Sequence, residues 1–162
     1  MTQTFTVTVT PTMDTSIYAA GDLWFDCAEI QMPGNARHGS WWLTDIQVID
    51  KDDQALQSFD LFFTDTTVDF GTLNSAPSIT DANALFIQGR VRLDGTATPP
   101  AGIDLGGSKL YSKSSGDPPL PLAVRSHADT PTKLYVAGMI VSGTPTNTAS
   151  GVVIRLTFSH KV

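Results

Sequence analysis

The sequence has few charged residues and no cluster of basic ones. Asp, Glu, Lys and Arg make up 16% of the 162 positions, well below the roughly 25% that is usual for globular proteins. The 10 Lys and Arg are scattered among 16 Asp and Glu, which gives a net charge of −6. Binding to nucleic-acid phosphates needs a basic stripe. Nucleic acid is therefore not a predicted partner.

The sequence also has a single cysteine and no long apolar run. Cys27 has no second cysteine to pair with, so an intramolecular disulfide is excluded. Its strand phase is that of Phe25, which predicts a buried, inert thiol rather than a reactive one. No run approaches the roughly 18 apolar residues that cross a membrane, and Met1–Thr4 does not begin a secretory signal. We expect synthesis in a cytoplasm and no membrane partner.

Signatures of chemistry are missing as well. We find no metal-ligand spacing, no glycine-rich phosphate loop and no nucleophile elbow, so we predict no catalytic, cofactor-binding or metal-binding residue and no enzyme. Two alternatives stay open. A hydrolase could form in space around His38, His127 or His160. A glycosidase could pair two carboxylates out of Asp26, Glu29, Asp45 and Asp60.

What the chain does have is segments in which apolar and polar residues alternate. In 5–10 the apolar Phe5, Val7 and Val9 face one way and threonines the other, as in a strand with one buried face. The 21 threonines suit exposed strand faces, because Thr is β-branched and polar. Further strands are predicted near 23–31, 42–48, 59–63, 87–93, 108–112, 120–124, 133–141 and 152–158. The residues predicted to share one face of their strand are Phe59, Leu61 and Phe63; Ile87, Val91 and Leu93; and Val152, Ile154, Leu156 and Phe158.

Two connections carry specific predictions. The polar turn 50–53 separates two alternating runs, which predicts a β-hairpin; a calcium loop is the alternative, although the spacing does not match the twelve-residue loop. One helical turn capped by Thr80 is predicted within 78–85. The strand 133–141 is apolar on both faces, which predicts a central strand buried on both sides or one whose outer face meets another subunit.

These patterns predict an all-β fold, a two-sheet antiparallel sandwich. A jelly roll comes first, because eight strands of this length, out of the nine segments, fill two four-stranded sheets; an immunoglobulin-like sandwich comes second. We expect one domain over 1–162, with an N-terminal strand arm at 1–12 and a Pro/Gly-rich loop region at 94–122.

Several residues are candidates for contacts with other molecules. The adjacent Trp41 and Trp42 must face opposite ways; we place Trp42 in the core with Ile46, and Trp41 with Leu43 on an outer apolar patch. That patch is an interface or is covered by the Pro-rich loop, and a stacking platform for a sugar ring is a third option. The remaining interface candidates are Thr4, Thr6 and Thr8 of the arm and the strand pair Arg90 and Arg92.

Two segments together are similar to a family of small structural proteins of tailed bacteriophages, often encoded near the major capsid protein. The first runs from Tyr18-Ala19-Ala20-Gly21-Asp22 through Asn35-Ala36-Arg37-His38-Gly39-Ser40 and 43–54 to Asp60-Leu61-Phe62-Phe63. The second is 138–146, Gly-Met-Ile-Val-Ser-Gly-Thr-Pro-Thr, and between the two lies Ile79-Thr80-Asp81-Ala82-Asn83. In this order they lie between positions 18 and 146 of the chain. His38-Gly39-Ser40 and the two tryptophans stand where the family has a more glycine-rich turn.

The resemblance implies a capsid decoration (cement) protein, located on the capsid surface of a virion and synthesised in the host cytoplasm. Its implied partners are the major capsid protein and copies of itself, plausibly as a trimer at points of local threefold symmetry. It implies no cofactor and no catalytic residue. The alternative is a carbohydrate- or host-receptor-binding module of a phage tail or head fibre.

Overall fold

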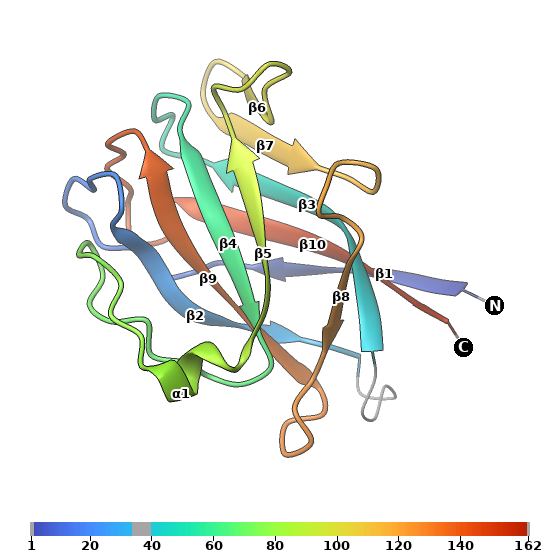
Figure 1. Ribbon diagram of the computed structural model, residues 1–162. Coiled ribbons are helices and arrows are strands. Elements are labelled where there is room, and N and C mark those ends of the chain that lie inside the picture. Colours follow the sequence, from blue (N-terminus) through green and yellow to red (C-terminus); the bar gives the residue numbers. More distant parts are fainter. Residues whose placement is uncertain (1, 34–39, 162) are drawn as a thin grey trace.

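The computed structural model describes residues 2–33 and 40–161. Two antiparallel sheets pack face to face (Figure 1). Sheet A has the order β1-β10-β3-β7-β6, with β8 also paired to β3, and sheet B has the order β2-β9-β4-β5. The strand bounds in sheet A are β1 Thr2–Val9, β3 Ser40–Asp50, β6 Gly102–Asp104, β7 Lys109–Lys113, β8 Leu122–Arg125 and β10 Val152–Lys161. Those in sheet B are β2 Leu23–Gln31, β4 Ser58–Thr64, β5 Ile87–Asp94 and β9 Lys133–Ser142.

The strand order is that of a jelly roll, and it confirms the predicted fold class. β1 pairs with β10, β2 with β9, β3 with β7 and β8, and β4 with β5, so the pairs are nested as in one long hairpin folded over on itself. Two sheets built from such a folded hairpin define the architecture, and in this chain sheet A has six strands because β7 and β8 both pair with β3 and β6 adds to β7. The predicted helical turn is also confirmed as α1, Asp81–Ala84, because the hydroxyl of Thr80 accepts a hydrogen bond from the Asn83 N–H.

The predicted hairpin around 50–53 is wrong. β3 lies in sheet A and β4 in sheet B, so the two strands flank a connection that crosses between the sheets. Alternation shows that each segment has a buried face, but it carries no information about the strand with which a segment pairs. The acidic residues do form a turn there, where Asp50 accepts a hydrogen bond from the Asp52 N–H at 2.9 Å.

The orientation predicted for the two tryptophans is also wrong. Trp41 is 1% exposed in the core, beside Leu43, whereas Trp42 is 47% exposed. The cause is a β-bulge: Asp45 pairs with Thr157 but Leu43 pairs with Phe158, so β3 carries one extra residue, Thr44. One extra residue in a period-two strand moves every side chain beyond it to the other face.

The same effect moves two other residues out of their predicted phase. Cys27 packs against the outer side of sheet B while Phe25 lies in the core, because the register of β2 shifts between Phe25 and Ala28. Ile87 is likewise on the outer side of sheet B, beyond a register shift between Phe63 and Thr64 in β4 against β5. The thiol is half-buried rather than buried, and burial raises its pKa.

The outer face of sheet B is covered by the chain itself. Val68 and Phe70 pack with Ala137 of β9 and Leu23 of β2 in a second apolar cluster. Phe62, Leu73 and Phe86 complete this layer, which includes the segment around α1 (lower left in Figure 1). β9 is therefore buried on both sides, as one of the two readings of its sequence predicted.

A pair of substitutions tests the bulge. We expect Trp41→Ala to lower the free energy of unfolding by about 3–5 kcal/mol, because it empties a large core site. Trp42→Ala should change it by no more than about 1 kcal/mol, because most surface substitutions are close to neutral. Urea unfolding followed by circular dichroism measures both. A larger loss of stability in Trp42→Ala than in Trp41→Ala would contradict the bulge and favour a strand with regular alternation.

Candidate interaction surfaces

The carboxylates that could serve a glycosidase are Asp26, Glu29, Asp45 and Asp60. Asp26 and Glu29 line one pocket, and Asp45 and Asp60 are not among its lining residues. The first two lie in β2: the carboxylate of Asp26 accepts hydrogen bonds from backbone N–H groups of Cys27 and Phe70, and that of Glu29 pairs with Lys133 at 2.7 Å. Asp60 lies in β4 and is held by arginines, and Asp45 lies in the other sheet. Each carboxylate in sheet B is engaged by its own partner.

The histidines are dispersed. The His127 ring nitrogen Nδ1 lies 3.5 Å from the Asp129 carboxylate, and Nδ1 of His160 lies 3.0 Å from the carbonyl oxygen of Ser40. His38 lies outside the described residues. Within 2–33 and 40–161, no group of three or more His, Cys, Asp or Glu is placed to hold a metal ion. The same segments contain no helix with the length and apolar character of a membrane span.

Two of the segments that carry the family resemblance, 18–22 and 138–146, meet at one end of the sandwich. The N–H of Gly21 donates to the carbonyl of Ile140 at 2.8 Å, and the N–H of Tyr18 donates to that of Pro145 at 2.9 Å. Gly21 has a φ of +96°, a conformation that glycine adopts without strain. The two segments, which are more than a hundred residues apart in sequence, therefore form one structural unit at this corner.

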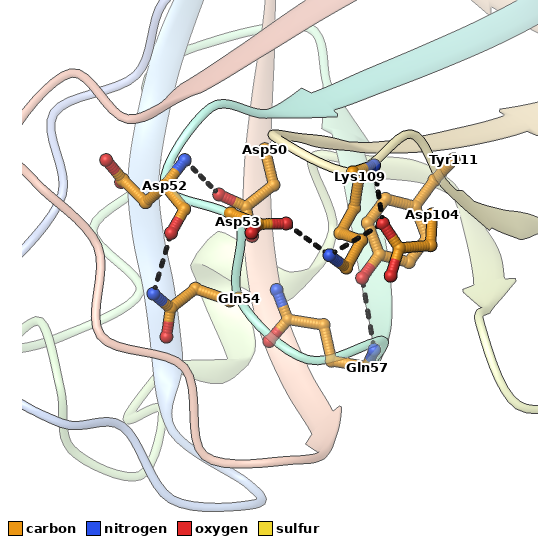
Figure 2. A network of polar contacts seen from close by, with 9 residues as sticks. Asp50, Asp52, Asp53, Gln54, Gln57, Asp104, Lys109 and Tyr111 are labelled. Atoms are coloured by element: carbon orange, nitrogen blue, oxygen red, sulfur yellow. Dashed lines mark hydrogen bonds and ion pairs between the residues drawn. The ribbon is translucent and has the colours of Figure 1, made fainter.

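The polar turn after β3, whose side chains are drawn in Figure 2, is linked to the same corner through Thr146 and Thr148. The Asp52 carboxylate accepts hydrogen bonds from the N–H and hydroxyl of Thr148, at 2.8 and 2.9 Å, and Gln54 Oε1 accepts one from the Thr146 N–H. Figure 2 shows Lys109 between the carboxylates of Asp53 and Asp104, to both of which it is ion-paired, and these contacts raise its pKa. These side chains stabilise a crossing between sheets.

One buried carboxylate in this network, that of Asp50, has an oxygen atom without a hydrogen-bond partner in the described part of the chain. Asp50 is fully buried, and this atom is its Oδ2. Burial raises its pKa. Asp94 shows the opposite behaviour: its Oδ1 accepts hydrogen bonds from the hydroxyl of Ser58 at 2.6 Å and from the N–H and hydroxyl of Thr96, which lower its pKa.

The outer face of sheet A is the broadest candidate surface. The pairing registers place its outward side chains in rows across the strands. One row is apolar: Val153, Ile49, Leu110 and Ile103. The next rows are polar, Thr8, Arg155, Gln47 and Ser112, then Thr6, Thr157 and Asp45. A fourth row holds Thr4, Ser159, Trp42 and Ala123.

Charge is distributed unevenly between the two sides of the molecule. Within the part of the chain that the structure describes, the charged side chains on the outer face of sheet A are those of Asp45, Arg125 and Arg155. The segment 52–89, which includes the cover of sheet B, contains six Asp and no Lys or Arg. The face of sheet A is therefore the part of an acidic protein where the fewest charges must be desolvated on contact.

The structure places the predicted interface residues differently. Trp41 and Leu43 are buried in the core, so they form no outer patch, and Trp42 takes the exposed position instead. Thr4, Thr6 and Thr8 are exposed on the outer face of sheet A. Arg90 and Arg92 are exposed on β5, but both pair with the fully buried Asp60 of the same chain, Arg92 through two hydrogen bonds of 2.8 Å. Contact of these threonines and arginines with a partner stays a prediction.

Sequence reasoning missed the apolar row that includes Ile103 and Leu110. The signal is present, since both are apolar residues in short strands, but the row exists only once the register of β6, β7 and β3 is known.

Comparisons with known proteins gave structural matches only. No protein-family model and no curated protein matches the chain. A solved structure titled the capsid of Ralstonia phage GP4 is similar over 100% of this chain and 85% of that chain, with 12% identity and a TM-score of 0.42. Tomato aspermy virus is similar over 99% and 78%, with 12% identity and a TM-score of 0.40, and a PRD1 vertex protein over 97% and 96%, with 9% identity and a TM-score of 0.40. The jelly-roll assignment rests on the strand order given above.

Asp50 and Asp94 should have opposite effects on stability. At pH 7, we expect Asp50→Asn to raise the free energy of unfolding by about 1 kcal/mol, because it removes a buried charge. Asp94→Asn should lower it by about 1 kcal/mol, because it weakens charge-assisted hydrogen bonds. Urea unfolding followed by tryptophan fluorescence measures both.

The pH dependence separates the two groups further. The folded-state pKa of Asp50 lies above its unfolded value of about 3.9. Ionised Asp50 therefore lowers the free energy of unfolding at pH values above the folded-state pKa. This loss of stability disappears as the pH falls to the unfolded value. The folded-state pKa of Asp94 lies below its unfolded value, so its contribution is present above about pH 3.9 and is lost as the pH falls through the folded pKa. Equal destabilisation by both variants at pH 7 would contradict this assignment.

Proposed function

We propose that the protein is a non-enzymatic structural component of a phage virion. It binds the outside of an assembled capsid and stabilises the shell through contacts with the major capsid protein and with copies of itself. The observation that carries the proposal is the outer face of sheet A, which is broad, poor in charge and crossed by an apolar row. Such a face can be desolvated against a partner at low electrostatic cost.

Two further features support this function. The jelly roll is an architecture of viral capsid domains, although lectins and cupins use it too. Two of the segments that resemble a family of phage structural proteins contact each other in the fold, through Gly21 with Ile140 and Tyr18 with Pro145. These segments form one packed unit of this chain.

The physical mechanism is linkage between binding and shell conformation. A protein that binds only the expanded shell stabilises that state, by an amount that grows with the ratio of free concentration to Kd. Many copies on a symmetric shell add their contacts by multivalency. The resemblance implies three copies at points of local threefold symmetry. Counting copies at those points on decorated shells tests that arrangement.

A carbohydrate-binding module is the second candidate, and one observation favours it. Trp42 is the one exposed tryptophan of the three, and its neighbours in the same row, Ala123 and Ser159, are small. An indole with open surroundings can stack on a sugar ring. Glycan-induced changes in tryptophan fluorescence that disappear in Trp42→Phe, without any binding to shells, would favour this function over the first.

The shell-binding test uses variants of the sheet A face. We expect the double variant Trp42→Ala, Ile103→Ser to bind expanded shells at least about 10-fold more weakly, because exposed aromatic and aliphatic anchors dominate interface energies. Co-sedimentation with shells of a phage major capsid protein, in expanded and unexpanded forms, measures this. The matched control is Ile17→Ser, which removes a 64% exposed apolar side chain in the loop between β1 and β2. Equal loss in the control, or no binding to either shell form, contradicts the proposal.

A further inference from the structure

The free edge of β1 differs from the other sheet edges of the molecule. An edge strand presents unpaired N–H and C=O groups, and folded proteins protect such edges by short strands, bulges, charges or a covering loop. In the described residues 2–33 and 40–161, β1 pairs with β10 alone, so its other side is an edge of sheet A.

The other edges carry protective devices. At the far side of sheet A, β6 has three residues. β8, which pairs with β3 alone, has four, and the side chain of Gln88 bonds both the N–H and the carbonyl of its Arg125. β2, at one edge of sheet B, contains two register shifts and is bridged to a covering loop: the N–H of Leu23 donates to Ser75, and that of Asn74 donates to Leu23. β5, at the other edge, presents Arg90 and Arg92 and is interrupted by a register shift.

β1 has none of these devices. Its eight residues, Thr2–Val9, pair with β10 in one unbroken register and contain no charge, no proline and no glycine. Its apolar side chains Phe5 and Val7 are only partly buried against the core. A long, regular, uncharged strand edge is a template for pairing with another strand.

We infer that β1 pairs antiparallel with β1 of a second copy, about a twofold axis at Thr6, and joins two A sheets into one. This register places Thr4 opposite Thr8 on the outer face and Phe5 opposite Val7 on the inner face, so like side chains meet on each side. A shift by one residue would oppose the polar face of one copy to the core face of the other. The inference deepens the proposed function by naming one contact between copies, and on a shell this contact can link chains of neighbouring groups.

Charge and area indicate how strong the pair is. The strand carries no charge, so two copies meet there without like charges in contact, although each chain has a net charge of −6. At about 3.4 Å per residue and a sheet thickness of about 10 Å, the edge covers on the order of 300 Å² per copy. Stable interfaces bury about 800 Å² per partner. The pair is therefore weak and depends on concentration.

A cysteine at the axis tests the geometry. In a Cys27→Ala background, we expect Thr6→Cys to form an intermolecular disulfide under mild oxidation, because opposed residues of antiparallel strands lie within disulfide range. The matched control is Thr157→Cys on β10, whose side chain lies 3.0 Å from that of Thr6 on the same face but one strand inside the edge. The control should crosslink at least about 10-fold more slowly.

Light scattering on a size-exclusion column at several concentrations provides the second measurement. We expect the mass to rise from one chain of 17.3 kDa towards two with concentration, and Thr6→Lys to weaken the rise at least about 10-fold, because two ammonium groups then face each other. A single-chain mass at every concentration, or equal crosslinking of Thr6→Cys and Thr157→Cys, overturns the inference. Because no shell is used, failure of shell binding and failure of this pair are observed separately.

Discussion

The fold depends on an aromatic contact that fixes the two sheets against each other and so determines which side chains lie on the outer faces. Trp24 packs on Phe59 with ring centroids 4.7 Å apart, and Phe59 packs on Tyr111 of the opposite sheet at 4.9 Å. The buried polar atoms of these rings are paired: the indole N–H of Trp24 donates to Asn147 at 2.9 Å, and the Tyr111 hydroxyl accepts a hydrogen bond from the Gln57 N–H at 3.1 Å. Buried aromatic rings whose polar atoms are satisfied can sit in few arrangements. The sheets are therefore held at one spacing and in one register, and the outer faces follow from that packing.

The alternation of apolar and polar residues predicts the strands well, because it follows directly from which face of a strand is buried. The bounds of β2 and most of the core side chains of β4 and β10 are those expected from the sequence. The errors concern Trp41, Cys27 and Ile87, and each lies beyond a β-bulge. A bulge changes the phase of a strand without changing its composition, so a single sequence carries little sign of it. Strand pairing is equally hidden, which is why two neighbouring strands in sequence were assigned to a hairpin that the fold does not contain.

The two outer faces illustrate how much of a candidate surface a sequence can predict. The apolar residues on both sides of β9 indicate that sheet B is covered, and the segment around Val68 and Phe70 covers it. The alternating threonines of β1 indicate an exposed face, and that face is exposed. The arginines of β5 are exposed too, but their charge is already engaged by Asp60, which is itself fully buried. A partner that recruited Arg92 would leave a buried carboxylate less well compensated, at considerable cost. That Arg90 and Arg92 already pair with Asp60 cannot be inferred from the sequence, which shows only two arginines on one phase of a strand.

The free edge of β1 and the outer face of sheet A are adjacent, and their combination has a physical consequence. A pair formed at the edge would extend the face, because Thr4, Thr6 and Thr8 lie both on that strand and on that surface. Neither contact needs to be strong alone. An edge of eight residues supports a weak pair, and a face with one apolar row and three described charges supports moderate binding. When copies are held on a symmetric lattice, each contact raises the effective concentration for the next. Weak self-association in solution and firm attachment to an ordered surface are therefore compatible properties of one sandwich.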